Sequence, residues 1–303
     1  MITFIQGIVG TPVTPFTSDD RVDAETFQRL VDFLVRQGVH VLGHPMHVGE
    51  NINLSFEERQ LIARLAIEAV NGRVPVFINT SLPGTGEVVK LSQDAQKAGA
   101  QGVIVISPYF WAPGPAAHLD HFVTVASSLD ISLVAYNYPE RLHVTITPEM
   151  VAELIRSCPN FVGLKDASFE MRYFIEVTRQ ASDLRPEFAV FSGLEYTLPA
   201  MAMGGAGSFS AISEVAPRLV MSLYNACVCG DFKLALPLQR KVSQLYSILS
   251  SGFPAYKVAM KIMGRPCGNP RKPIATLDTK AVSEIEKGMK ALGIQDDEPY
   301  GWG

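Results

Sequence analysis

Short apolar runs alternate with helical periods along most of the chain. The runs are continuous rather than alternating in polarity, which is typical of parallel strands buried on both faces. We predict eight strands, at Ile8–Phe16, His40–Gly43, Val74–Thr80, Gly102–Ser107, Ser132–Asn137, Phe161–Leu164, Phe188–Ser192 and Gly207–Ala211. A helical pattern follows each run, and capping residues mark several helix starts; Ser55 with Glu58 three positions later has the spacing of a capping box.

The number and order of these units predict the fold class. Residues 1–228 hold eight strand-then-helix units, which indicates an α/β protein with a (β/α)8 TIM barrel. Residues 229–303 lack strand-like runs and are expected to form a C-terminal helical region that ends in an exposed tail, DDEPYGWG. A doubly wound open sheet is the alternative, but its G-x-G-x-x-G signature is absent after the first run.

Composition narrows the possible functions. The net charge of −4 gives no basic surface for nucleic acid. We expect no membrane span, because no apolar run is long enough, and the first residues lack a signal-peptide pattern. The four cysteines include no C-x-x-C pair and favour a reduced, cytoplasmic chain over a disulfide framework.

Lys165 is the first candidate for chemistry. It directly follows the run Phe161–Leu164, and active sites of barrel enzymes lie at the carboxyl ends of the strands. Burial there would lower the lysine pKa, and a neutral amine can attack a ketone to form a Schiff base. The alternative is a buried ion pair with the neighbouring Asp166, and position alone leaves both readings open.

Two further residues follow the strand before Lys165. Tyr136 closes that run, where a phenol can relay protons, although a buried structural tyrosine is the alternative. Arg141 lies in the loop after it, and its planar guanidinium suits a substrate carboxylate. A surface arginine without a substrate role is the alternative.

A series of short motifs occurs along the chain between Gly7 and Leu292. They are T-P-x-T-P-F (Thr11–Phe16), G-E (Gly49-Glu50), S-P-Y (Ser107–Tyr109), Y-N-x-P-x-R (Tyr136–Arg141), G-L-K-D (Gly163–Asp166), S-G (Ser192-Gly193), M-G-G-x-G (Met203–Gly207), V-A-P (Val215–Pro217) and K-x-x-x-x-x-x-G (Lys257–Gly264). In this order and spacing, the chain resembles the dihydrodipicolinate synthase / N-acetylneuraminate lyase family of class I Schiff-base aldolases.

The resemblance implies a set of expectations. It implies a TIM barrel with C-terminal helices and a Schiff base at Lys165, usually with pyruvate. It implies Tyr136 as the general acid/base and Arg141 as a ligand for the second substrate's carboxylate. Its partners would be a keto acid and an aldehyde, without a metal or organic cofactor. Many members are tetramers, so a homo-oligomer, tetramer or dimer, is expected.

The sequence departs from the family pattern around the keto acid. In the synthases a G-T-T-G-E loop supplies two hydroxyls, and here His47 and Val48 take their places. Tyr109 keeps one hydroxyl of the usual tyrosine pair, whereas Phe110 replaces the tyrosine that a neighbouring subunit supplies. We expect His47 to bind the carboxylate, since imidazole titrates near neutrality, together with backbone N–H groups around Val48 and Gly49.

These departures favour an aldolase or lyase that acts on a 2-keto-3-deoxy acid or a related aldol. Gly193 and Phe209 complete the expected substrate-binding residues. Dihydrodipicolinate synthesis proper is one alternative, and a keto-acid-binding protein with reduced catalysis is another. A third is a metal-dependent barrel enzyme that uses His44 and His47.

Overall fold

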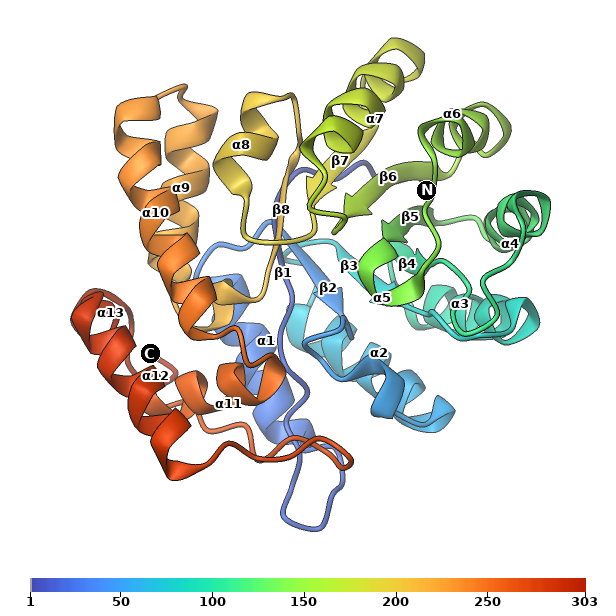
Figure 1. The fold of residues 1–303 in the computed structure, drawn as a ribbon. Coiled ribbons are helices and arrows are strands. Elements are labelled where there is room, and N and C mark those ends of the chain that lie inside the picture. The colour runs from blue at the N-terminus through green and yellow to red at the C-terminus, as the bar shows by residue number, and fades with distance from the viewer. Residues whose placement is uncertain (1) are drawn as a thin grey trace.

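A computed structural model describes residues 2–303, and it confirms the (β/α)8 barrel. Eight parallel strands close in sequence order, with β8 paired to β1 (Figure 1). The strands are β1 (Gly7–Gly10), β2 (Val41–His44), β3 (Val76–Asn79), β4 (Gly102–Ile106), β5 (Ser132–Asn137), β6 (Phe161–Asp166), β7 (Ala189–Ser192) and β8 (Gly207–Ser210). All of their residues are buried, as the continuous apolar runs predict.

Helices surround the barrel. They are α1 (Ala24–Arg36), α2 (Phe56–Val70), α3 (Thr85–Ala98), α4 (Pro115–Ser127), α6 (Pro148–Ser157), α7 (Met171–Leu184), α8 (Thr197–Ala202) and α9 (Pro217–Val228). Three short elements lie between the strands and these helices: η1 (Asn51–Asn53), α5 (Pro139–Leu142) and η2 (Ile212–Glu214). The capping box of Ser55 and Glu58 is present at the start of α2. Across residues 2–303, none of the helices has both the length and the hydrophobicity that a bilayer crossing requires.

The first strand is shorter than predicted. The apolar run extends from Ile8 to Phe16, but β1 ends at Gly10. Pro12 and Pro15 lack the N–H that a central strand donates to its neighbour, so the ladder cannot continue through them. The segment after Gly10 instead becomes a loop at the barrel mouth.

The barrel interior forms a hydrophobic cluster of its own, beneath the mouth. Val9, Phe77, Ile104, Val134 and Phe191 belong to this cluster and are almost completely buried. A second and larger cluster fills the layer between the sheet and the helices. This division is expected of a TIM barrel, whose interior is packed by side chains and leaves room for chemistry at its end.

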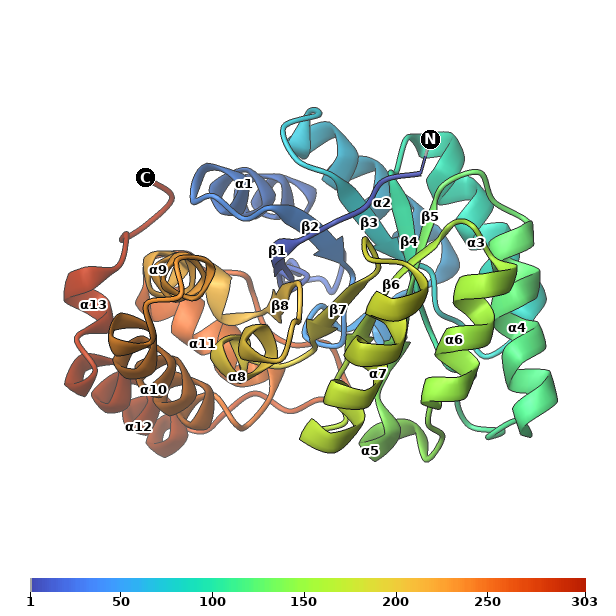
Figure 2. The same cartoon turned by 90° about the horizontal axis from the view of Figure 1, so that it is seen from above.

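The C-terminal helices form one group beside the barrel (Figures 1 and 2). They are α10 (Phe232–Ile248), α11 (Phe253–Ile262), α12 (Thr279–Ala291) and α13 (Ile294–Asp297). Helix α10 packs on α8 and α9, and α12 contacts both α10 and α11. The group therefore attaches to the last units of the barrel, and it brings α11 back toward the mouth.

The prediction of an exposed C-terminal tail is wrong. The Glu298 carboxylate accepts hydrogen bonds from the backbone N–H groups of Arg218 and Leu219, at 2.9 and 2.8 Å. These N–H groups lie in the first turn of α9, where a carboxylate satisfies donors that have no partner within the helix. The Trp302 ring packs edge-on against Phe33, with 6.3 Å between the ring centroids.

Candidate active site

A pocket of about 160 Å³ opens at the carboxyl ends of the barrel strands. Its walls come from the barrel and from the C-terminal helices. The lining residues are Thr11, Met46, His47, Val48, Tyr136, Tyr138, Arg141, Lys165, Gly193, Leu194, Glu195, Phe209, Ala211, Tyr246, Leu249, Ser250, Gly252, Phe253 and Tyr256. This is the end of a TIM barrel at which substrates bind.

Lys165 lies inside β6 rather than just after it, and only 4% of its surface is exposed. Its ammonium nitrogen is 3.8 Å from the centroid of the Tyr136 ring and 5.0 Å from that of Phe209. Burial lowers the pKa of Lys165 to about 7, and the nearby Glu195 carboxylate opposes part of that shift. A substantial fraction of the amine is therefore neutral and nucleophilic near neutral pH.

Asp166 does not pair with Lys165, so the ion-pair reading is wrong. Its carboxylate accepts hydrogen bonds from Asn137 Nδ2 at 2.8 Å and from Ser168 Oγ at 2.9 Å. Successive side chains of a strand point to opposite faces, which directs Lys165 into the barrel and Asp166 away from it. The lysine is thus left without a bonded carboxylate.

Glu195, rather than Asp166, is the carboxylate whose charge affects the pKa of Lys165. It is 4% exposed, and its carboxylate accepts from Ser210 Oγ at 2.9 Å and from the Ile212 N–H at 3.0 Å. Burial raises the pKa of Glu195 to about 7, although these hydrogen bonds favour the charged form. Sequence reasoning did not single out Glu195, because it follows β7 and is remote in sequence from Lys165.

Tyr136 lies directly across the β5–β6 pair from Lys165. Its side chain is buried and stacks on Tyr138, with 5.6 Å between ring centroids. Burial raises the pKa of Tyr136 well above its ordinary value of 10, so the phenol is protonated at neutral pH. It can therefore donate a proton to an oxygen atom held beside Lys165.

His47 lies at the pocket mouth with part of its surface exposed. Its ring meets Tyr138 and Phe253 edge-on, with centroid distances of 6.0 and 5.7 Å. Desolvation, together with the positive charges of Arg141 and Lys165, lowers the pKa of His47 to about 4. With a lowered pKa the imidazole is neutral at pH 7 and can donate from one ring nitrogen only.

The backbone beside His47 offers one open donor. Val48 lines the pocket, and its N–H donates to no acceptor within residues 2–303. The Gly49 N–H instead donates to the Met46 carbonyl at 3.0 Å, and Gly49 does not line the pocket. A Cβ at Gly49 would come within 2.7 Å of His44 Cε1, so packing requires glycine here.

Arg141 stands on the short helix α5 at the rim of the pocket. Its side chain is exposed, and a hydrogen bond with the Tyr138 side chain raises its pKa. The guanidinium is thus a permanent positive charge at the entrance. That position suits a carboxylate at the outer end of a substrate.

The remaining predicted residues divide between the pocket and its surroundings. Gly193 lines the pocket, and a Cβ there would lie 2.7 Å from the Asp166 carbonyl oxygen. Phe209 is buried beside Lys165. Tyr109 is half-buried outside the pocket, and Phe110 projects from the chain with 85% of its surface exposed. These last two residues do not meet substrate within one chain.

The histidines considered as metal ligands do not come together. His44 is buried, with Nε2 3.3 Å from Thr14 Oγ1 and Nδ1 3.1 Å from the Pro12 carbonyl oxygen. Within residues 2–303, no three His, Cys, Asp or Glu side chains form a group that could hold a metal ion. Both ring nitrogens of His44 thus have structural partners.

Sequence reasoning missed the contribution of the C-terminal region. Sequence reasoning placed residues 229–303 in a separate helical region, but four residues of that region line the pocket: Tyr246, Leu249, Phe253 and Tyr256. Pro254 lies in the first turn of α11, a position that tolerates proline. No periodicity in these helices indicates which distant element they cover.

Comparisons with known proteins agree with this geometry. The model of the dihydrodipicolinate synthetase family matches residues 4–292. A 4-hydroxy-tetrahydrodipicolinate synthase from Methanoculleus marisnigri is 35% identical over 93% of this chain and 97% of its own. The probable 2-dehydro-3-deoxy-D-pentonate aldolase YjhH of Escherichia coli is 33% identical over 95% and 97%. The structure of YagE, a prophage protein of the same family from E. coli in complex with pyruvate, aligns with a TM-score of 0.92 and 30% identity over 96% of this chain and all of that one.

Proposed function

The chain belongs to the dihydrodipicolinate synthetase family and is a lyase of the class I aldolase type, and on this premise we propose a covalent mechanism. In this mechanism, Lys165 forms a Schiff base with pyruvate or a similar 2-keto acid. The observation that carries the proposal is a buried amine that lies 3.8 Å from the ring centroid of the buried Tyr136, and burial lowers the pKa of that amine to about 7. The pyruvate in the structure of YagE supports the keto-acid class.

Each step of the reaction has a group to perform it. The neutral Lys165 amine attacks the C2 carbonyl, and Tyr136 donates its proton as the C2 hydroxyl leaves as water. The resulting iminium withdraws electrons from C3. In the cleavage direction, the Tyr136 phenolate takes the proton of the C4 hydroxyl, the C3–C4 bond breaks, and an aldehyde leaves. The Tyr136 phenol then donates this proton to C3 of the enamine, and water hydrolyses the resulting iminium to release pyruvate and the Lys165 amine.

The pocket also supports a substrate orientation. The keto-acid carboxylate lies between the His47 ring and the open Val48 N–H, while Arg141 at the rim holds a second carboxylate or a polar end. The hydroxyls of the synthase loop are absent here. We therefore favour cleavage or synthesis of a 2-keto-3-deoxy acid or a related aldol, and the similarity to YjhH supports this choice.

Borohydride trapping tests the covalent step. The protein is incubated with pyruvate, reduced, digested and analysed by mass spectrometry. The expected result is one added pyruvate remnant on the peptide that contains Lys165 and none in Lys165→Ala. An adduct that persists in Lys165→Ala, or no adduct at all, would falsify the mechanism.

A substrate screen tests the reaction. Pyruvate release from a panel of 2-keto-3-deoxy acids is coupled to lactate dehydrogenase, and condensation of pyruvate with aspartate semialdehyde is assayed in parallel. We expect cleavage of at least one keto-deoxy acid to exceed the condensation rate. A higher condensation rate would instead favour dihydrodipicolinate synthesis.

We also propose a homo-oligomer, tetramer or dimer, in the cytoplasm. Phe110 and Trp111 are 85% and 77% exposed, and their rings form an edge-on pair with 5.1 Å between centroids. Two large aromatic rings on one exposed loop are typical of an interface with another chain. Light scattering on the wild type and on Phe110→Asp tests this assembly; an equal molar mass of one chain for both proteins would contradict it.

A further inference from the structure

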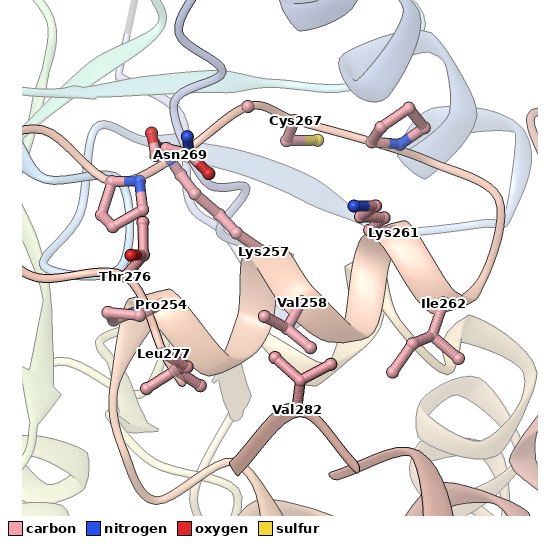
Figure 3. Close-up of a pocket in the computed structure, with 13 residues that line it drawn as sticks. Pro254, Lys257, Val258, Lys261, Ile262, Cys267, Asn269, Thr276, Leu277 and Val282 are labelled. Atoms are coloured by element: carbon pink, nitrogen blue, oxygen red, sulfur yellow. Dashed lines mark hydrogen bonds between the residues drawn. The ribbon is translucent and has the colours of Figure 1, made fainter. Parts of the chain in front are cut away.

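A second cavity, of about 540 Å³, lies against another face of α11. Residues of α11, of the segment 265–278 and Val282 of α12 line it (Figure 3). Phe253 and Tyr256 of α11 face the catalytic pocket, whereas Lys257 and Lys261 line this second cavity. One helix thus separates two cavities, and the second has the volume of a small-molecule site.

One end of this cavity is apolar. Val258 and Ile262 of α11 line it from one side, and Val282 of α12 faces them across the space (Figure 3). Leu277 and Pro254 extend the same wall. These side chains can cover a hydrocarbon or aryl group of a ligand and remove it from water.

The other end of the cavity carries positive charge. Lys257 is already neutralised, because its amine lies 2.8 Å from Glu50 Oε1 and 3.0 Å from the Asn269 carbonyl oxygen. Lys261 forms no ion pair within residues 2–303, and none of the residues that line the cavity is acidic. One cation is therefore available to a ligand.

Uncommitted hydrogen-bond donors lie in the same region. Gly268 and Asn269 line the cavity, and their backbone N–H groups donate to no acceptor in the described chain. Gly268 has a φ of +70°, and a Cβ there would meet the Phe16 carbonyl oxygen at 2.0 Å, so the backbone can take this path only with glycine. Backbone N–H groups next to a lysine are a typical arrangement for binding an anionic group.

From this combination we infer that the cavity binds a small carboxylate with an apolar body. The carboxylate accepts hydrogen bonds from Lys261 and from the N–H groups of the 268–269 segment, and the apolar body packs between Val258 and Val282. The single available cation matches the one negative charge of a monoanion.

We expect this ligand to change keto-acid binding in the catalytic pocket through α11; this part of the inference rests on the proposed function. Lys257 joins this helix to Glu50, which ends the loop that carries His47 and Val48. Displacement of α11 by a ligand would move Phe253, which packs edge-on against His47. The cavity is therefore placed to change the affinity for the keto acid.

Calorimetric titration with 4-phenylbutyrate tests the site itself. We expect one site per chain, with affinity at least about tenfold weaker in Lys261→Met, because a charge-assisted hydrogen bond is lost. Val282→Trp, which fills the apolar end, should also abolish binding. Lys287→Met, which removes an exposed lysine of α12 outside the cavity, should bind as the wild type does. The neutral analogue 4-phenylbutan-1-ol should bind at least about tenfold more weakly than the acid.

Undetectable binding of 4-phenylbutyrate, or equal affinities in the wild type, Lys261→Met and Val282→Trp, would overturn the site. These measurements need no turnover, so they decide the site even if Lys165 forms no Schiff base. The coupling is tested separately by keto-acid cleavage: 4-phenylbutyrate should change the apparent KM at least about twofold in the wild type and leave Lys261→Met unchanged. Binding without any change in KM would overturn the coupling.

Discussion

The Lys165 amine lies 3.8 Å from the centroid of the Tyr136 ring, directly across the parallel pair of β5 and β6. An ammonium over an aromatic face is stabilised by the ring quadrupole, yet burial still lowers the pKa of Lys165 to about 7. Two adjacent strands thus hold a nucleophile and a proton donor together without any flexible segment between them.

Replacement of Tyr136 by Phe should lower kcat about 10²- to 10⁴-fold, because the phenol that moves protons is lost while the ring remains. Borohydride trapping of pyruvate on Lys165 should still occur, only more slowly. Tyr138→Phe, which alters the tyrosine stacked on Tyr136, is the matched control, and its kcat should fall much less. Equal losses in the two variants would contradict the proton-transfer role.

The rate should depend on pH through Lys165. The neutral amine reacts, so kcat/KM should rise with pH and level off above a midpoint near the pKa of about 7. The Glu195 carboxylate raises that pKa, so Glu195→Gln should shift the midpoint to lower pH. A midpoint that is unchanged in Glu195→Gln, or that moves to higher pH, would show that Glu195 does not raise the pKa of Lys165.

His47→Ala should raise the KM for the keto acid about tenfold, the size of one lost hydrogen bond to a charged group. Because the pKa of His47 is about 4, this effect should be the same at pH 6 and pH 8. The double variant His47→Thr/Val48→Thr supplies the two hydroxyls of the synthase loop and should recover part of the affinity. An unchanged KM in His47→Ala would exclude the residue from binding.

The buried pair of Lys257 and Glu50 should be important for stability. Lys257→Met leaves Glu50 as an unpaired buried charge, and we expect a loss of about 3–5 kcal/mol in the free energy of unfolding. The surface pair of Lys241 and Asp297 has the same 2.7–2.8 Å separation, yet Lys241→Met should cost at most about 1 kcal/mol. Urea denaturation measures both, and similar losses would contradict the argument from burial.

Glu214 should make stability depend on pH. Its Oε2 accepts from the Val13 N–H at 2.8 Å, Oε1 has no partner in the described chain, and burial raises the pKa to about 8. Between its ordinary value of 4.5 and about 8, the folded protein binds this proton and the unfolded chain does not, so stability falls as pH rises.

Glu214→Gln removes this titration and should reduce the fall in melting temperature between about pH 5 and pH 8. Other buried carboxyls, such as Glu195, titrate in the same window in both proteins, so the difference between the two curves isolates Glu214. Parallel curves for the wild type and the variant would show that Glu214 does not titrate there.

Much of the fold was predictable because its determinants are local. Continuous apolar runs identified the eight strands, and the Ser55 side chain caps α2 where the sequence places it. The order of these units left few topologies besides a closed barrel. Since active sites of barrels follow the strand ends, the same pattern directed attention to Lys165 and Tyr136.

The partners of those residues were not predictable. The sequence offered Asp166 as the neighbour of Lys165, but strand alternation turns the two apart, and Glu195 reaches the lysine from beyond the next strand. Likewise, the pKa of His47 is lowered by desolvation in the pocket and by the charges of Arg141 and Lys165, which are remote in sequence. The electrostatics of a site depend on distances in space, and these are set only when the chain is packed.

The sequence by itself therefore determined the elements, their order and the candidate nucleophile, because periodicity, capping and proline geometry act over a few residues. Tertiary structure alone decided that α11 closes the pocket with Phe253 and Tyr256, that the tail carrying Glu298 caps α9, and that a second cavity lies behind the same helix. These contacts join segments far apart in the chain, and they follow from how whole surfaces pack, which no local pattern encodes.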